Sequence, residues 1–231
     1  MIRNYNDFIT ALLKVGFSGS VFGKEDEVYG LFRYGWGAED ENSLHWHTGD
    51  IDTDPWEWRM RVLEERNDIA YAKLFFKKGG YITKDWYPYF LATRRGGNTF
   101  EETYKDGTIS HFAKRIYDVV SDNNALPSHI IKRLAGFTKD DKSGFDRALT
   151  ELQMKMFITM CGQQQKFSKR GEEYGWSSTV FCTTERFFND DIFEKAEKIS
   201  ADKAAKIIRE QLYKLNPNAP EKKIIKFIFG G

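Results

Sequence analysis

The segment from residue 108 to residue 188 constrains the fold more than any other part of the chain. Apolar residues recur at helical spacing over residues 111–120, and shorter helices are predicted from Ser128, as an N-cap, and from near Ser143. Residues 157–161 and 177–183 then read as two strands joined by a polar, glycine-containing loop. Three short helices followed by a two-stranded ribbon is the order of a winged helix-turn-helix unit. The sequence therefore predicts such a unit here.

The remaining residues predict two further parts, so that the fold class is α+β. Residues 1–107 predict an aromatic-rich α+β domain, with a helix over 5–15 that Gly16 ends, a strand over 29–36 and a helix that starts at Asp54-Pro55. A hairpin is predicted over 69–83, with residues 77–80 (KKGG) as its turn. Residues 189–231 predict a helical extension. The chain has 19 Phe, 11 Tyr and 6 Trp, which excludes disorder, because each buried ring removes roughly 150–250 Å² from water.

Charge is segregated along the chain. Residues 132–170 carry nine Lys and Arg against four Asp and Glu, a local charge of +5, whereas the whole chain carries +1. Residues 39–57 carry seven Asp and Glu and no Lys or Arg. A net charge of +1 gives no overall attraction to nucleic acid, so any such attraction must be local. The basic segment coincides with the third predicted helix and the loop that follows it.

This coincidence predicts double-stranded DNA as the partner. In a winged helix-turn-helix unit the third helix enters the major groove, and the wing suits contacts with the sugar-phosphate backbone. The outward face of the third helix is predicted to comprise Lys142, Ser143, Asp146, Arg147, Thr150 and Gln153. The wing is predicted to contribute Gln163, Gln164, Gln165, Lys166, Lys169 and Arg170. An ordinary solvated helix and loop is the alternative.

A dense cluster of aromatic and charged residues at positions 54–59 is the candidate catalytic site. A carboxylate in an aromatic-walled pocket has a raised pKa, which suits general acid or base work. The candidates are Asp54 or Glu57 to activate water, Arg59 to contact a phosphate or leaving group, and Trp56 and Trp58 to form the pocket. The alternative is an ordinary surface pair between Glu57 and Arg61, which lie four residues apart.

Histidines just before this cluster raise a metal alternative. His45 and His47 have strand spacing, and three aspartates at alternate positions 50–54 follow them. A calcium loop counted from Asp50 would place Pro55 where the turn glycine belongs. The alternative is a polar loop with a helix cap at its end.

Other signatures are missing from the sequence. It has no Gly-x-Ser-x-Gly, no phosphate-binding loop and no His-Glu-x-x-His, so the sequence predicts no cofactor. Cys161 and Cys182 are interpreted as small buried side chains in a reducing compartment. No stretch reaches the roughly 18 apolar residues that a membrane span needs. The expectation is therefore a cytoplasmic protein without a membrane partner.

Several runs of residues resemble a known family. Residues 125–136 (ALPSHIIKRLAG), 145–154 (FDRALTELQM) and 176–187 (WSSTVFCTTERF) resemble the winged-helix DNA glycosylases of the AlkZ type. The runs DTDPWEWR at 52–59 and FFKKGGYI at 75–82 resemble the bacterial AlkZ-related proteins, and this second likeness covers nearly the whole chain. The likeness to the glycosylases themselves covers mainly residues 108–188.

The resemblance implies tandem winged-helix units around a DNA groove and the excision of alkylated or crosslinked bases in DNA repair. The glycosylases carry a Gln-x-Gln or Gln-x-Asp motif in their first unit, and residues 1–107 contain no match to it. Residues 163–165 (QQQ) match the Gln-x-Gln motif but lie in the predicted wing. Two hypotheses follow: a DNA-binding relative of DNA glycosylases, with or without catalysis, or a non-enzymatic regulator or interaction module with a small-ligand pocket in residues 1–107.

Overall fold

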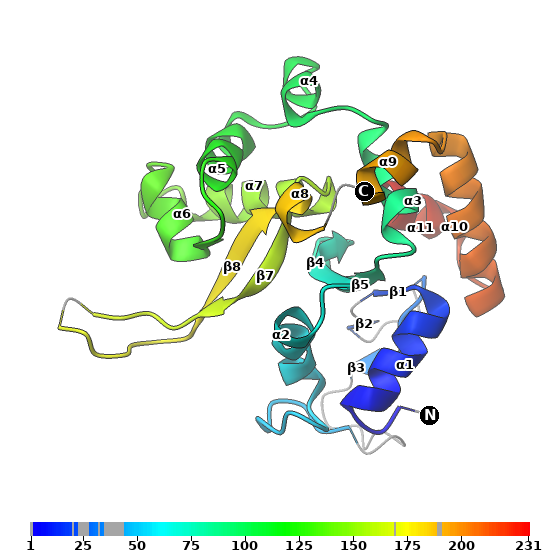
Figure 1. Ribbon diagram of the computed structural model, residues 1–231, viewed down its shortest axis with the longest axis horizontal. Helices are drawn as coiled ribbons and strands as arrows, with labels where there is room; N and C mark the ends of the chain where they lie inside the picture. Colours follow the sequence, from blue (N-terminus) through cyan, green and yellow to red (C-terminus); the bar gives the residue numbers. More distant parts are fainter. Residues whose placement is uncertain are drawn as a thin grey trace. The chain divides into compact units, whose positions relative to one another are not determined.

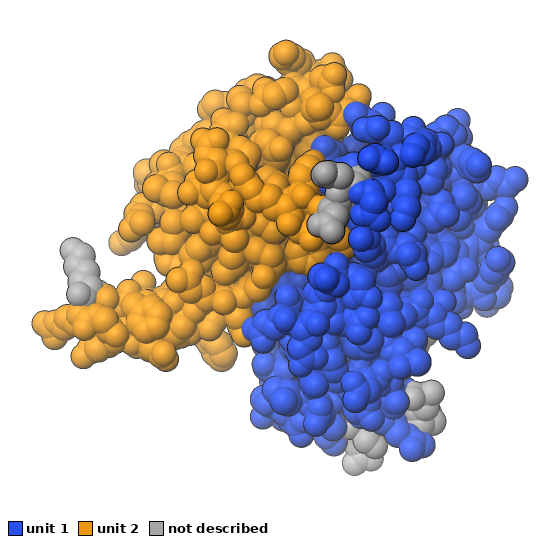
Figure 2. All heavy atoms as spheres, viewed as in Figure 1, with its two compact units in different colours: residues 1–97, 190–231 blue, residues 98–189 orange. Residues whose placement is uncertain are grey.

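A computed structural model describes residues 2–19, 21–22, 28–31, 33–34, 44–168, 170–188 and 191–231. The chain is α+β, and it divides into two compact units. Unit 1 comprises residues 1–97 and 190–231, and unit 2 comprises residues 98–189 (Figure 2). The segment predicted as a C-terminal helical extension thus groups with the N-terminal residues.

Unit 1 contains a small antiparallel sheet and six helices among its described residues. Its elements are α1 (Tyr5–Val15), β1 (Phe17–Gly19), β2 (Val21–Phe22), β3 (Arg33–Tyr34), α2 (Pro55–Glu65), β4 (Ile69–Phe75), β5 (Lys78–Thr83), α3 (Tyr87–Arg95), α9 (Asp191–Glu197), α10 (Ala201–Leu215) and α11 (Glu221–Phe229) (Figure 1). Strand β5 pairs antiparallel with both β1 and β4, and β2 pairs parallel with β3.

Several of the sequence predictions for unit 1 are confirmed. Helix α1 covers residues 5–15 and ends at Gly16, which adopts a left-handed conformation. Helix α2 begins at Pro55, with Asp54 as its N-cap. Of the strand predicted over 29–36, only Arg33 and Tyr34 are strand within the described residues. Helix α11, which follows Pro220, lies within the helical extension predicted for residues 189–231.

The predicted hairpin is present, but its turn is shorter than expected. Gly79 and Gly80, predicted as turn residues, lie inside β5. The reason is aromatic packing over the strand. A Cβ atom on Gly79 would lie 2.3 Å from the Tyr71 hydroxyl oxygen, and one on Gly80 would lie 2.4 Å from the Phe75 ring. The glycines therefore leave room for two rings instead of making the turn.

The core of unit 1 joins distant parts of the sequence. The Phe227 ring on α11 stacks on the Phe75 ring of β4, with centroids 3.8 Å apart. Phe17 on β1 packs against the same ring of Phe227 at 5.7 Å and against Phe90 of α3 at 5.4 Å. All four side chains are almost fully buried. This packing explains why the C-terminal helices belong to unit 1.

Arg94 on α3 connects three elements in this region. Its guanidinium donates hydrogen bonds to the carbonyl oxygens of Leu74 at 2.9 Å, Phe227 at 2.8 Å and Ile228 at 3.0 Å. Burial lowers the pKa of Arg94 to about 9, so the side chain is still a cation at neutral pH. The buried charge is thereby held by main-chain oxygens of β4 and α11.

Unit 2 has the element order predicted for residues 108–188. Its elements are α4 (Phe100–Lys105), α5 (His111–Ser121), β6 (Leu126–Pro127), α6 (Ser128–Leu134), α7 (Lys142–Met154), β7 (Ile158–Gln164), β8 (Ser178–Thr183) and α8 (Thr184–Phe187) (Figure 1). Strand β8 pairs antiparallel with β7 and also with the short β6. The predicted helices and the two-stranded ribbon are confirmed.

Hydrogen bonds at the helix starts fix the helices of unit 2. Ser110 caps α5 by accepting from the Ala113 N–H, and its hydroxyl lies 2.6 Å from Glu151 on α7. Ser128 was predicted as the N-cap of α6, but Pro127 holds that position. The Ser128 hydroxyl instead lies 2.9 Å from the Ser178 hydroxyl at the start of β8, which links α6 to the ribbon.

Candidate nucleic-acid interface

The first two turns of α7 present a polar, largely basic face. The apolar residues of this helix, among them Phe145, Ala148 and Leu152, are buried in unit 2. The residues left exposed on its first half are Lys142, Ser143, Asp146 and Arg147. The Arg147 Nε donates to the Ser143 carbonyl oxygen at 3.2 Å, which lays the guanidinium along the helix. The predicted outward face therefore exists over these two turns.

The second half of α7 does not continue this face. Thr150 and Gln153 are buried, so the prediction that they lie on the outward face is wrong. The Thr150 hydroxyl donates to the Asp146 carbonyl oxygen at 2.8 Å, and the Gln153 amide donates to the Leu149 carbonyl oxygen at 2.8 Å. Bonds to the carbonyl four residues earlier allow both polar side chains to enter the interior.

The wing, residues 165–177 between β7 and β8, is braced by its own hydrogen bonds. Tyr174 N–H donates to the Lys166 carbonyl oxygen at 3.0 Å, and the Ser177 hydroxyl donates to the Gln165 side chain at 2.8 Å. Gln163 and Gln164, predicted as wing residues, lie at the end of β7 and are exposed. Within the wing Arg170 is exposed, and Gln165 and Lys166 are half-buried. Lys169 lies outside the described residues. The described candidates of the wing are thus open to solvent, at least in part.

Three aromatic side chains of the wing are exposed, and the sequence analysis missed them. Trp176 is 88% exposed, and Phe167 and Tyr174 are each about half exposed. In Figure 1 the hairpin that carries them extends away from the helices of unit 2. Large exposed rings that gather on one segment mark an interaction surface. The available signal was their position in a polar loop without the apolar periodicity that would place them in a core.

Positive charge also gathers where α6 meets the wing. Burial lowers the pKa of His129 on α6, and the charges of Lys166 and Arg133 lower it further. At neutral pH the imidazole is therefore uncharged, while Lys166 and Arg133 stay close enough to act on it. The base of the wing and α6 thus add to the basic character of α7.

The N-terminal cluster has a different structure from the one predicted, and Asp54 is its clearest case. This carboxylate is fully buried. It accepts hydrogen bonds from the backbone N–H groups of Thr48 at 2.8 Å, Gly49 at 3.1 Å and Trp56 at 2.8 Å. Asp54 therefore caps α2 and shapes the preceding loop, and its oxygens are occupied by these donors.

The two tryptophans of the cluster have opposite environments. Trp58 is fully buried and stacks on Phe8 with ring centroids 5.2 Å apart. Trp56 is 37% exposed, and the Arg59 guanidinium lies 3.3 Å from its ring centroid. The His47 ring lies 4.8 Å from the Trp56 ring. The structure thus joins His47, Trp56 and Arg59 in one partly exposed stack, whereas Trp58 faces the core.

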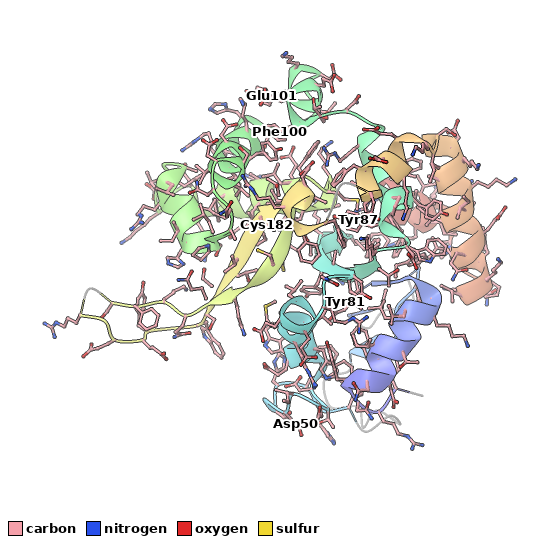
Figure 3. The ribbon with its side chains drawn as sticks, in the orientation of Figure 1. Asp50, Tyr81, Tyr87, Phe100, Glu101 and Cys182 are labelled. Carbon is pink, nitrogen blue, oxygen red and sulfur yellow. The ribbon has the colours of Figure 1, made fainter. Side chains whose placement is uncertain are left out.

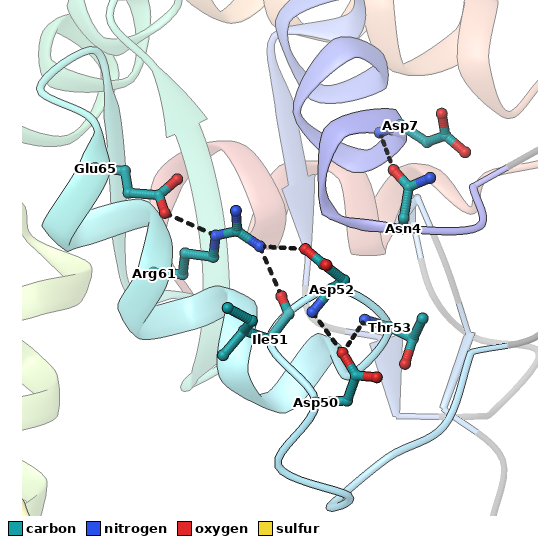
Figure 4. A network of polar contacts seen from close by, with 8 residues as sticks. All are labelled: Asn4, Asp7, Asp50, Ile51, Asp52, Thr53, Arg61 and Glu65. Carbon is teal, nitrogen blue, oxygen red and sulfur yellow. Dashed lines mark hydrogen bonds and ion pairs between the residues drawn. The ribbon is translucent and has the colours of Figure 1, made fainter.

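Arg61 has partners other than Glu57, the residue with which a surface pair was considered. It forms ion pairs at 2.8 Å with Asp52 and at 2.8 Å with Glu65 (Figure 4). Glu57 is half-buried on α2. In the preceding loop, Asp50 accepts from the N–H groups of Asp52 and Thr53, and these bonds lower the pKa of Asp50. The aspartates therefore hold a turn together.

The described residues contain neither a group of metal ligands nor a helix that could span a membrane. Across the described ranges, no group of three or more His, Cys, Asp or Glu side chains could hold a metal ion. His45 and His47, the metal alternative, lie in the loop before α2. In the same part of the chain, no helix combines the length and apolar character needed to cross a membrane.

Comparison with known proteins gives one match. A family model described as AlkZ related matches residues 2–229, which is nearly the whole chain. No curated protein and no solved structure matches the chain.

Proposed function

The chain belongs to the AlkZ-related family, and on this premise we propose that it is a duplex-DNA-binding protein related to the DNA glycosylases of DNA repair. The observation that carries the proposal is the exposed Lys142 and Arg147 on α7, in the same unit as a wing that carries Lys166, Arg170 and exposed aromatic rings. Local positive charge of this kind attracts phosphates even when the net charge is close to zero.

The proposed docking treats unit 2 as a winged helix-turn-helix unit. Its helices α5, α6 and α7 are followed by the β7–β8 ribbon, and β6 pairs with β8 beside that ribbon. This order and pairing support a placement of α7 in the major groove. There, Ser143 and Arg147 would meet base edges, and Lys142 would meet a phosphate.

The wing would bind alongside. Its amides and bases suit sugar-phosphate contacts, which position a protein on the duplex. The proposed contact residues are Gln163 and Gln164 at the end of β7, and Gln165, Lys166, Lys169 and Arg170 of the wing. Trp176, with 88% of its surface exposed, adds a stacking platform for a base that has left its pair.

The first experiment measures duplex binding by fluorescence anisotropy across a salt series. Each phosphate contact adds about 0.9 to the slope of log affinity against log salt. Because Lys142→Glu with Arg147→Glu removes the Lys142 phosphate contact, it is expected to reduce that slope by about 1. Affinity at low salt is expected to fall at least about tenfold. The control is Lys203→Glu with Lys214→Glu on α10, which makes the same change of charge in unit 1. An equal loss in both double variants, or no binding by the wild type at low salt, would refute the proposal.

A second experiment concerns Trp176. Stacking on a base contributes about 1–3 kcal/mol. The base opposite an abasic site has no pairing partner and is free to stack on Trp176. Trp176→Ala is therefore expected to weaken binding to an abasic-site duplex about tenfold. Binding to the intact duplex is expected to change less. Phe229→Ala, which removes an exposed ring from α11, is the matched control. Equal effects of Trp176→Ala on both duplexes would remove the stacking role.

Base excision is the catalytic extension of this proposal. Since the Asp54 oxygens already accept three backbone hydrogen bonds, Glu57 is the better candidate to activate water. Arg59, beside Trp56, would contact a phosphate or the leaving group. Alkali cleavage of a methylated duplex, run beside the binding measurements, tests this step. Binding without cleavage would favour a non-enzymatic regulator or interaction module.

A further inference from the structure

Two free cysteines lie together at the base of the wing hairpin. In the register of β7 and β8, Thr159 is opposite Cys182 and Gly162 is opposite Val180. Cys161 falls at a bulge, where the register shifts. Cys161 thus lies between residues that pair with Phe181 and Val180, close to Cys182 on the neighbouring strand. The two side chains are close enough for each to shift the pKa of the other.

The two thiols differ in accessibility. Cys182 on β8 is buried (Figure 3), whereas Cys161 is only half-buried, so the prediction of two buried cysteines is correct for Cys182 alone. The interaction between the two side chains lowers the pKa of Cys161 and raises that of Cys182, which burial raises further. A partly exposed thiol with a lowered pKa beside a buried thiol is the arrangement of an attacking and a resolving cysteine.

We propose that Cys161 and Cys182 are a peroxide-sensitive dithiol that closes to an intramolecular disulfide. The Cys161 thiolate attacks one oxygen of hydrogen peroxide, the O–O bond breaks, and the departing hydroxide takes a proton to become water. Cys161 is then a sulfenic acid. The Cys182 sulfur attacks it, the S–S bond forms, the S–O bond breaks, and a second water leaves with the Cys182 proton. Two thiols and one peroxide thus give one disulfide and two waters.

The disulfide would join β7 to β8 where the bulge interrupts their pairing. The bulge lies on the body side of the wing, because Gln164 and Ser178 still pair beyond it. A covalent bond at this place restricts the motion of the two strands that carry the wing. A dithiol reductant would reopen it by thiol–disulfide exchange.

The test uses the full chain, reduced, freed of reductant and treated with graded hydrogen peroxide. Both thiols are expected to disappear together, with a mass loss of about 2 Da per monomer and full recovery in dithiothreitol. A disulfide-linked dimer, or a mass gain of about 32 Da from sulfinic acid without the 2 Da loss, would overturn the proposal. The mass needs no variant, so a folding defect cannot obscure the result.

Two variants assign the roles. Cys182→Ser is expected to leave Cys161 to oxidise alone, with a gain of about 16 Da. Cys161→Ser is expected to make Cys182 react at least about tenfold more slowly, because that thiol is buried. Equal reaction rates of the two variants would contradict this assignment. No readout involves DNA, so failure of the DNA-binding proposal would leave the result intact.

Discussion

Replacing Trp58 by alanine is expected to lower the free energy of unfolding by about 3–5 kcal/mol. The indole is fully buried, stacks on Phe8 and meets Tyr5 edge-on at 6.3 Å. Its removal leaves a cavity that the surrounding helices α1 and α2 cannot fill completely. Urea denaturation followed by circular dichroism measures the loss as a lower midpoint without a change of slope.

Trp56→Ala is the matched control, because it removes the same side chain two positions earlier on the same helix. Trp56 contacts Arg59 and His47 on a partly exposed surface, so its loss is expected to cost about 1 kcal/mol or less. Similar losses for the two variants would mean that Trp58 does not belong to the core. The larger loss for Trp58 would leave Trp56 as the tryptophan of this cluster that can meet a ligand.

Arg94→Met is expected to lower the free energy of unfolding by about 3 kcal/mol or more. Methionine fills much of the volume but donates no hydrogen bond, so the carbonyl oxygens of Leu74, Phe227 and Ile228 lose the donor that Arg94 supplies. A buried acceptor without a partner costs about 1–3 kcal/mol. Thermal and urea unfolding measure the effect.

The neighbouring Arg95 supplies the control. Arg95 is half-buried, and its guanidinium lies 5.7 Å from the Phe193 ring centroid. Arg95→Met is therefore expected to cost about 1 kcal/mol or less. A loss for Arg94→Met no greater than for Arg95→Met would show that the three main-chain acceptors find other donors.

Local signals in the sequence predicted the helices well, because caps and apolar spacing act within one turn. The Asp54-Pro55 pair and Gly16 mark real helix boundaries for this reason. The pair Gly79-Gly80 was misread as a turn, since its cause is the packing of two rings that come from another strand. Packing between distant residues leaves no mark in a local pattern. The same limit explains why the place of Phe227 in the core of unit 1 was not foreseen.

The candidate site was predicted in part. Segregated charge identified Lys142 and Arg147, which are exposed. The exposure of Trp176 was not predicted, because aromatic residues are usually interpreted as core residues and their exposure depends on the tertiary structure. Asp54 was predicted both as an N-cap and as a catalytic candidate. The two roles compete for the same carboxylate, because the Asp54 oxygens already accept three backbone hydrogen bonds.

The discontinuous make-up of unit 1 has a consequence for synthesis on the ribosome. Residues 1–97 leave the exit tunnel first, yet their core lacks the Phe227 ring until α11 has emerged. All residues of unit 2 have left the tunnel once residue 189 has emerged, so unit 2 can fold before the core of unit 1 is complete. During that interval Phe17, Phe75 and Phe90 lack the ring that later covers them. The nascent chain therefore exposes an apolar surface on residues 1–97, of the kind that chaperones bind.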